Sequence, residues 1–380
     1  MLNDSKNQMC SRCVMDATVS GVRFDENGVC SYCRMHDKLE QRFALNESNR
    51  QKFDALIAAM KRKGKNKPYD CIVALSGGMD STYSLYLAKK LGLRPLAVHF
   101  DNGWVSEAAD ENIRKVLKLL DVDLRTVSYD WEDLKPLYVA GLKASTPDVC
   151  LCCMIGIFSA LYQTAYKEGI KYIILGTSFR TEGIVPLKWR CTDGRYFDDV
   201  VKKYGKGKVK GFNKLRISNV FFYSFVKHIK TVQFPLYVEY ETGEIRRTLE
   251  EEVGWVAGGG HHFDCRFHSV MHYLRVKKFN ADKRKVDFSA LVRSKQMKRE
   301  TALQELTEQP SDNDPEVKYC IDKLGLSDEE FREILKSEPK DFTNYANYYS
   351  LIRHFRLVVR LLCKLHILPE TAYEKYFECN

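Results

Sequence analysis

The feature that most constrains the fold is an alternation of short apolar runs with amphipathic segments between residues 71 and 175. The apolar runs predict strands, and the segments between them carry apolar residues at helical spacing. Strands that alternate with helices build a parallel sheet covered on both faces, so we expect a doubly wound α/β fold. The predicted strands are Cys71–Leu75, Pro95–Phe100, Leu124–Val127 and Tyr172–Leu175, and the predicted helices between them are Ser81–Lys90, Glu107–Leu120 and Met154–Lys167.

Polar and glycine-containing segments follow three of these strands. Ser76 comes after the first strand, Asp101 after the second and Gly176 after the fourth. Ligands of parallel sheets bind beyond the carboxyl ends of the strands. We therefore expect these segments to lie along one rim and to form one site.

The turn after the first strand reads Ser76-Gly77-Gly78-Met79-Asp80-Ser81 and opens a helix. Glycine has no Cβ, so its amide can approach an anion closely. The helix start adds free N–H groups and the positive end of its dipole. The turn thus predicts a phosphate-binding cradle. The lysine pattern of the Walker loop is missing, so we do not expect γ-phosphoryl transfer.

This hexamer is similar to the SGGxDS signature of the ATP pyrophosphatase (PP-loop) family. The resemblance implies that ATP adenylates a substrate oxygen and that the loop holds the departing pyrophosphate, with Mg²⁺ near Asp80. The alternatives are a chance hexamer and a helix-capping role for Asp80. The residues implied in ATP binding are Ser76, Gly77, Gly78, Asp80, Ser81, His99, Asp101, Gly176 and Thr177.

The N-terminal segment carries two CxxC pairs, Cys10/Cys13 and Cys30/Cys33, separated by sixteen residues. This spacing is typical of a four-thiolate zinc knuckle. Such a site has no open coordination position, so we expect structural zinc that folds a segment poor in apolar residues.

A third CxxC lies within Cys150-Leu151-Cys152-Cys153. We interpret these cysteines as partly buried thiols near the site. The alternative is a zinc or iron–sulfur site that needs a further ligand, with Cys191 or Cys265 as candidates. Some PP-loop tRNA thiolases hold a cluster through such cysteines.

A glycine–histidine segment, Gly259-Gly260-His261-His262-Phe263-Asp264-Cys265-Arg266-Phe267, is followed by Lys278-Phe279-Asn280-Ala281-Asp282-Lys283-Arg284. Together they resemble the GGxHxxSRF and KxFxxDKR stretches of the N-acetyl sugar amidotransferases, a PP-loop subgroup. Cys265 departs from the serine common there. The resemblance implies substrate binding by His261, Arg266, Lys283 and Arg284, with Lys283 and Arg284 also catalytic alongside Asp80.

The activity implied by this subgroup converts a sugar acetamido group into an acetamidino group through an O-adenylyl intermediate. A nucleotide-sugar, such as a UDP-diacetamido-uronic acid, would be the substrate, in lipopolysaccharide or O-antigen biosynthesis. The cofactors would be ATP, Mg²⁺ and structural Zn²⁺. No glutaminase triad is recognisable, so we expect ammonia from a separate glutaminase/cyclase-like protein pair.

Two other functions fit part of the sequence. A PP-loop tRNA thiolase would use the same loop, with the basic stretch Val200–Arg216 on RNA, and the net charge of +10 suits any anionic partner. Aromatic residues are hardly interleaved with those lysines, so nucleic acid is the less favoured partner. A non-catalytic zinc-knuckle protein that binds nucleotide is the other alternative, which an intact SGGxDS hexamer disfavours.

Composition breaks divide the chain into four predicted parts. We expect a zinc knuckle at 1–45, the PP-loop domain at 46–190, a substrate-binding or lid region at 191–300 and a helical region at 301–380. Within 191–300 we predict helices at Leu215–Lys227 and Glu244–Val253. The sequence has neither an apolar run long enough for a membrane span nor an apolar N-terminal segment, so we expect a cytoplasmic protein.

Overall fold

Five parallel strands form one sheet in the computed structural model, which describes residues 8–205, 211–258 and 264–378. The strand order is β3-β2-β1-β4-β5. The four strands predicted from the sequence are confirmed, and β1 ends one residue earlier than expected. Their bounds are β1 (Cys71–Ala74), β2 (Pro95–Phe100), β3 (Leu124–Val127), β4 (Tyr172–Leu175) and β5 (Lys230–Gln233).

The fifth strand, β5, was not predicted. It is only four residues long and reads Lys-Thr-Val-Gln, so it lacks an apolar run. It pairs in parallel with β4, with Tyr172 opposite Lys230 and Leu175 opposite Gln233. Its place beside a fully buried strand, rather than its own sequence, accounts for its formation.

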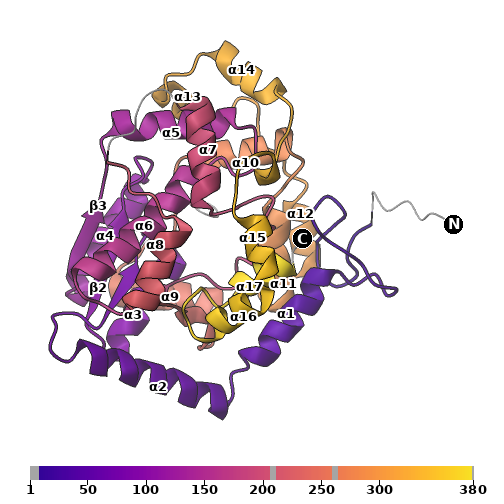
Figure 1. Cartoon of the computed structure of the whole chain (residues 1–380). Coiled ribbons are helices and arrows are strands. Elements are labelled where there is room, and N and C mark those ends of the chain that lie inside the picture. Colours follow the sequence, from indigo (N-terminus) through magenta and orange to yellow (C-terminus); the bar gives the residue numbers. More distant parts are fainter. Residues whose placement is uncertain (1–7, 206–210, 259–263, 379–380) are drawn as a thin grey trace.

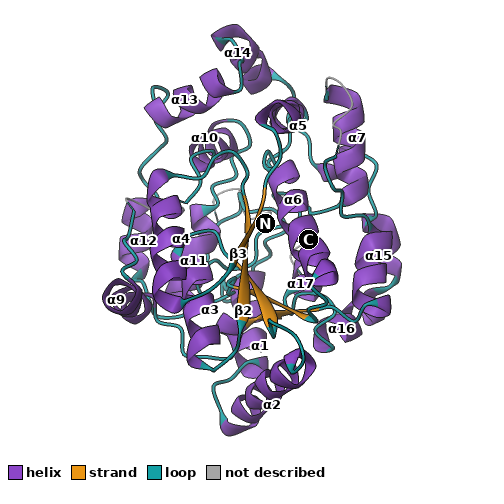
Figure 2. Cartoon of the chain, turned by 90° about the vertical axis from the view of Figure 1, so that its left-hand side faces the viewer, coloured by secondary structure: helices purple, strands orange, loops and turns teal. Residues whose placement is uncertain are grey.

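Helices cover both faces of the sheet, as expected for a doubly wound fold (Figure 2). Successive side chains of β1 point to opposite faces, so Val73 packs with one group of helices and Ile72 with the other. The Val73 face is covered by α2 (Glu47–Gly64), α3 (Met79–Lys90), α4 (Glu107–Leu120) and α9 (Thr242–Val253). The Ile72 face is covered by α5 (Trp131–Lys143), α6 (Leu151–Lys167), α7 (Gly194–Tyr204), α10 (His268–Lys277), α13 (Pro315–Lys323) and α14 (Asp328–Lys336).

Helix α5 is another element that the sequence did not reveal. Proline disfavours helix interiors, and Pro136 lies within it. The helix forms because the Asp130 side chain accepts a hydrogen bond from the Glu132 amide at its start, and because Leu134, Leu137 and Tyr138 are buried on one face. Tertiary packing therefore outweighs the local preference.

The first helix, α1 (Ser31–Arg42), lies beside the C-terminal helix α17 (Ala372–Phe377) in Figure 1. Arg42, at the end of α1, donates to the Glu370 carbonyl at 3.3 Å and pairs with Glu374 at 3.5 Å. The predicted helix at Leu215–Lys227 appears as α8 (Ile217–Phe221), continued by η2 (Phe222–Val226), a π-helical turn. The remaining elements are η3 (Phe234–Leu236), α11 (Arg284–Arg293), α12 (Arg299–Glu305), η4 (Phe342–Asn344), α15 (Tyr349–His354), α16 (Arg356–Lys364) and α17 (Ala372–Phe377).

None of the helices in the described ranges combines the length and the apolar composition needed to cross a bilayer.

Candidate functional site

The turn after β1 folds into a cradle of backbone amides and hydroxyls. Ser81 Oγ accepts a hydrogen bond from the Ser76 amide at 3.1 Å, and Ser76 Oγ accepts one from the Gly78 amide at 3.3 Å. The two hydroxyl oxygens lie 3.1 Å apart. The two hydroxyls thus fix the conformation of the loop at the start of α3. Free N–H groups and the helix dipole favour an anion there.

Gly77 is the residue that this turn requires. Its φ is +87°, in the left-handed region, and a Cβ there would lie 2.5 Å from the Ala109 carbonyl oxygen of α4. Its own carbonyl accepts a hydrogen bond from Trp255 Nε1 at 2.9 Å. The loop is therefore fixed from behind by α4 and by the segment after α9, leaving Ser76 exposed on the open side.

Three carboxylates meet beside the cradle, and we name Asp80, Glu182 and Asp264 the carboxylate group. The Asp80 and Glu182 side chains are in hydrogen-bond contact, and Asp264 lies close enough to raise the pKa of Asp80. Asp264 Oδ2 would lie 3.2 Å from a Cβ at Gly78, so it faces the phosphate cradle. Tyr240 donates a hydrogen bond to Asp80 Oδ1.

Burial, followed by the charge of Glu182, raises the pKa of Asp80 to about 8. This crowding of negative charge is compensated only in part by the Tyr240 hydroxyl. Carboxylate oxygens are the ligands that Mg²⁺ takes when it bridges to phosphates. Asp80 and Glu182, whose side chains are in contact, could therefore hold a Mg²⁺ ion together with the polyphosphate of ATP, whereas the oxygens of all three carboxylates are not within 4.8 Å of one another.

Gly176, at the end of β4, lets this strand approach the start of α3. A Cβ at Gly176 would lie 2.6 Å from the Asp80 carbonyl oxygen and 2.9 Å from the Ser81 amide nitrogen. Both are backbone atoms, which cannot rotate away. The role visible in the structure is thus close packing that sets the position of the loop.

We expect Gly176→Ala to displace the start of α3 and to destabilise the protein by about 1–3 kcal/mol, the usual cost of overpacking. Thermal unfolding and ATP binding by calorimetry would measure both effects. Gly243→Ala is a suitable control, because its nearest neighbours are atoms of the flexible Glu241 side chain. Unchanged ATP affinity in Gly176→Ala would contradict the role that we assign to this contact.

The other rim residues make contacts within the protein. His99 Nδ1 donates to the Leu75 carbonyl at 2.8 Å, and Asp101 Oδ1 accepts from the Gly103 amide at 2.9 Å. Thr177 is exposed, and its hydroxyl oxygen accepts from Gln233 Nε2 at 2.8 Å. The contacts of His99 and Asp101 shape the rim, and their roles in ATP binding stay predictions.

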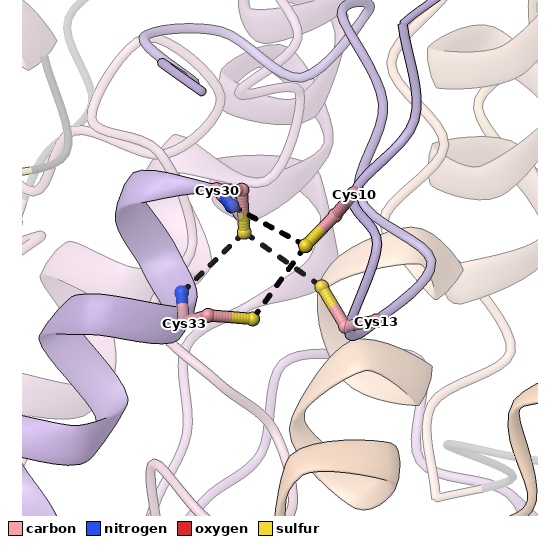
Figure 3. A group of neighbouring side chains, drawn as sticks. All are labelled: Cys10, Cys13, Cys30 and Cys33. Atoms are coloured by element: carbon pink, nitrogen blue, oxygen red, sulfur yellow. Dashed lines mark hydrogen bonds between the residues drawn. The ribbon is translucent and has the colours of Figure 1, made fainter. Parts of the chain in front are cut away.

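The four N-terminal cysteines form one cluster, with the CxxC pairs facing each other (Figure 3). All four are buried, and their sulfur atoms lie within 4.8 Å of one another. The Cys10–Cys33 and Cys13–Cys30 sulfur distances are both 3.7 Å. Tetrahedral zinc with Zn–S bonds of about 2.3 Å requires sulfurs about 3.8 Å apart, so the site fits zinc.

Cationic side chains from the second half of the chain surround this cluster. Arg293 Nη1 donates to Cys13 Sγ at 3.6 Å, and Arg299 donates to the carbonyls of Cys13 and Cys10, both at 3.2 Å. Four thiolates around Zn²⁺ carry a net negative charge, which Arg293 would offset. The knuckle is therefore packed on α11 and α12 rather than being an independent appendage.

A buried arginine joins the knuckle region to the site. Arg180 forms a two-pronged ion pair with Glu40 of α1, at 2.8 and 2.9 Å. It also donates to the carbonyls of Phe43 at 3.0 Å and Leu236 at 3.2 Å. Arg180 lies two residues before Glu182, a member of the carboxylate group.

The cations predicted to bind substrate are each paired with an acid here. Arg266 forms a two-pronged pair with Glu316, with both distances 2.9 Å, and its guanidinium carbon lies 3.7 Å from the centre of the Tyr319 ring. Lys283 pairs with Asp287 at 2.7 Å, and Arg284 pairs with Asp282 at 2.8 Å. His261 lies outside the described residues.

The basic stretch that could have served RNA is partly neutralised. Lys203 pairs with Asp199, and both Lys214 and Arg216 pair with Asp198. Residues 206–210, which carry three more of its lysines, lie outside the described residues.

Sequence reasoning missed Glu182, Tyr240 and Asp264 as members of the site, since Asp264 was noted only as part of a motif and was given no role. Glu182 follows the predicted strand-end segment at Gly176, so its proximity to the rim could have been noticed. Tyr240 carried no recognisable signal, because it reaches Asp80 from a loop 160 residues away.

Two family models match separate parts of the chain. Residues 261–359 match the C-terminal domain of the LPS biosynthesis protein WbpG-like family, and residues 70–146 match the queuosine biosynthesis protein QueC family. The second range contains the phosphate cradle, and the first contains Asp264 and Arg266.

Individual relatives are similar to parts of the chain. An uncharacterised protein of Methanocaldococcus jannaschii is 31% identical over 169 residues, 44% of this chain and 58% of its own length. A probable tRNA sulfurtransferase of Methanothermobacter thermautotrophicus is 31% identical over 117 residues, 28% of each chain. The solved structure of the U34-tRNA thiolase NcsA from Methanococcus maripaludis, with its 4Fe-4S cluster, aligns at a TM-score of 0.32 and 12% identity, covering 81% of this chain and 91% of its own.

The five-stranded sheet, the phosphate cradle and the two matched ranges support the fold class predicted from the sequence. The chain carries a PP-loop domain of the adenine nucleotide alpha hydrolase-like type, followed by a C-terminal domain of the WbpG-like LPS biosynthesis type.

Proposed function

We propose that this protein uses ATP to activate the acetamido oxygen of a nucleotide-linked sugar and replaces that oxygen with ammonia. The observation that carries the proposal is the position of Asp264. This residue belongs to the range matched by the LPS biosynthesis family, and its carboxylate faces Gly78 of the phosphate cradle. The part of the chain that suggests a sugar substrate therefore reaches the place where ATP would react.

The first step would form a bond between the amide oxygen and the α-phosphorus of ATP and break the bond to pyrophosphate. The amides of Gly77 and Gly78 and the hydroxyls of Ser76 and Ser81 would hold the departing pyrophosphate. Asp80 and Glu182 would bind Mg²⁺, which supplies positive charge against the phosphate oxygens. Alignment and charge compensation are the protein's main contributions to such a step.

In the second step ammonia would add to the imidate carbon, and AMP would leave with the original oxygen. The product is an acetamidino sugar, and the proton released goes to solvent. Most ammonia is protonated at neutral pH, so a partner glutaminase that delivers it directly would be an advantage. We propose such a protein pair as the partner.

Among the three predicted cations, Arg266 is the best candidate for binding an anionic group of the sugar nucleotide. Its side chain is 33% exposed, whereas the Lys283 side chain is 10% and that of Arg284 is 21% exposed. A partly exposed guanidinium can exchange Glu316 for a substrate carboxylate or phosphate. Arg284 donates to the carbonyls of Glu305 and Glu308, which suits a positioning role.

The test is turnover of the full chain with ATP, Mg²⁺, ammonium chloride and a UDP-diacetamido-uronic acid. We expect equal amounts of AMP and pyrophosphate, and a sugar product whose mass shows NH in place of O. ADP as the product, or AMP formation that does not depend on the sugar, would contradict the proposal.

A tRNA-thiolating enzyme is the second candidate, favoured by the relative that is named a probable tRNA sulfurtransferase. The same assay with bulk tRNA and a sulfide donor distinguishes the two. AMP formation that requires tRNA, together with thiolated nucleosides after digestion, would replace the sugar assignment.

A further inference from the structure

Helix α16 presents a row of leucines on its outer side. Leu357, Leu361 and Leu365 follow one another at intervals of four residues and are 79%, 54% and 45% exposed. Residues four apart lie above one another on one side of a helix. Val359 and Cys363, on the other side, are buried. The helix therefore packs on the protein with one side and leaves a second apolar side exposed.

A row of cations runs beside these leucines. Arg356, Arg360 and Lys364 are also four residues apart, each directly precedes one of the leucines, and all three are exposed. Arg356 pairs with Glu378 at 3.2 Å. The sequence contains neither aspartate nor glutamate in residues 342–369. This part of the chain thus combines exposed apolar side chains with an excess of positive charge.

The segment formed by α8 and η2 has the same character. Phe221 and Phe225 are exposed, and their rings stack with the centroids 4.8 Å apart. Lys227 Nζ lies 5.1 Å from the centre of the Phe222 ring. Residues 200–238 also contain no acid in the sequence. Exposed aromatic side chains and cations therefore occur together here as well.

Both segments are attached to β5, the edge strand of the sheet. The Ile229 amide, just before β5, donates to the Tyr223 carbonyl of η2 at 2.9 Å. The Thr231 amide of β5 donates to the His366 carbonyl, just after α16, also at 2.9 Å. Figure 2 shows α15 and α16 along the right-hand edge of the molecule. The two apolar and basic segments thus adjoin the same edge of the sheet.

We propose that α16, together with the α8–η2 segment, binds the surface of a bilayer that contains anionic lipids. Leucine and phenylalanine side chains enter the boundary between head groups and acyl chains, while lysine and arginine contact the lipid phosphates. The adjacent rows of α16 place both kinds of side chain side by side, as such a surface requires. The helix would lie on the bilayer and not cross it.

Charge favours this partner over a second copy of the chain. A symmetric contact uses the same surface of both copies, so a contact through α16 would bring two rows of cations into one interface. Residues 342–369 supply no acid to neutralise them. An anionic lipid surface supplies the negative charge that both segments lack. This contact needs neither ATP nor a sugar, so it is independent of the proposed function.

The experiment is cosedimentation of the full chain with vesicles of phosphatidylcholine, either alone or mixed with an equal part of phosphatidylglycerol. We expect binding to the mixed vesicles that falls as salt is added, and little binding to phosphatidylcholine alone. Arg360→Gln with Lys364→Gln should weaken binding by about fivefold for each cation removed. Leu357→Glu with Leu361→Glu should weaken it further, because two inserted side chains are lost and two negative charges are added. Phe221→Glu should weaken it through the second segment.

Leu119→Glu is the matched control, because Leu119 is a leucine of α4 that is 61% exposed and lies outside both segments. This variant should bind like the wild type, and thermal unfolding shows whether each variant is folded. The proposal is overturned if the chain does not bind the mixed vesicles, if it binds both kinds of vesicle equally, or if the paired leucine variant binds unchanged. Loss of binding in Leu119→Glu would also overturn it. Light scattering provides a further test, since a dimer that the paired leucine variant dissociates would assign this face to a second copy instead.

Discussion

Asp80→Asn is expected to lower AMP formation by about a hundredfold or more, the scale on which a single group that stabilises transition-state charge contributes. The substitution keeps the shape of the side chain and its acceptor oxygen for Tyr240, but removes the charge that would hold Mg²⁺ against the phosphates. Pyrophosphate release under saturating ATP and sugar nucleotide measures the loss. Asp110→Asn, an exposed acid on α4 paired with Arg114, is the matched control and should retain full activity.

The same variant should make the protein without nucleotide more stable. The pKa of Asp80 is about 8 in the folded protein and about 3.9 in an unfolded chain. The folded state therefore binds more protons, and ionisation of Asp80 costs stability as the pH rises from about 4 to about 8. Without Mg²⁺, Asp80→Asn should thus melt higher than the wild type, with a larger gain at pH 8 than at pH 5. Full activity, or a gain in melting temperature that is largest at pH 5, would refute the role of Asp80.

Cys13→Ala is expected to abolish zinc binding and to release residues 8–43 from the rest of the fold. The free energy of zinc binding is of order 10 kcal/mol in small zinc domains and is coupled to their folding. The buried side chains around the cysteines, including Met15 and Tyr32, would then lose their fixed positions. Zinc analysis, thermal unfolding and limited proteolysis of the N-terminal segment measure the effect, and a strong chelator should reproduce it.

Cys71→Ala is the control for this experiment. Cys71 is a free, fully buried cysteine of β1 that lies away from the knuckle cluster. Its loss should cost packing energy but leave zinc and the protease resistance of the N-terminus intact. A Cys13→Ala protein with a full zinc content would show that the four cysteines are not the ligands.

The core of the fold could be predicted because local pattern and tertiary structure agree there. The strand Pro95–Phe100 and the helix Glu107–Leu120 match the prediction at both ends, because an apolar run marks the strand and apolar residues at helical spacing mark the helix. The spacing of Cys10, Cys13, Cys30 and Cys33 likewise predicted a cluster that the structure confirms. In both cases the residues that predict the structure are close together in the sequence.

The rest depends on contacts between distant segments. Strand β5 forms only because β4 offers an edge, and helix α5 forms despite Pro136. The carboxylate group combines residues 80, 182 and 264, which no local pattern joins. Lys283 pairs with Asp287, four residues further along the chain, whereas the motif match had suggested only a substrate-binding and catalytic lysine.

The buried contacts of Arg180 have a consequence for any survey of inactive variants. Its guanidinium joins Glu40 and the end of α1 to the loop that carries Glu182. Loss of zinc from the knuckle should therefore disturb the carboxylate group, because Arg180 joins the two regions. Random mutagenesis selected for loss of turnover would collect substitutions at Glu40 and Arg180 alongside those in the glycine turn, although neither residue belongs to the phosphate cradle or to the carboxylate group.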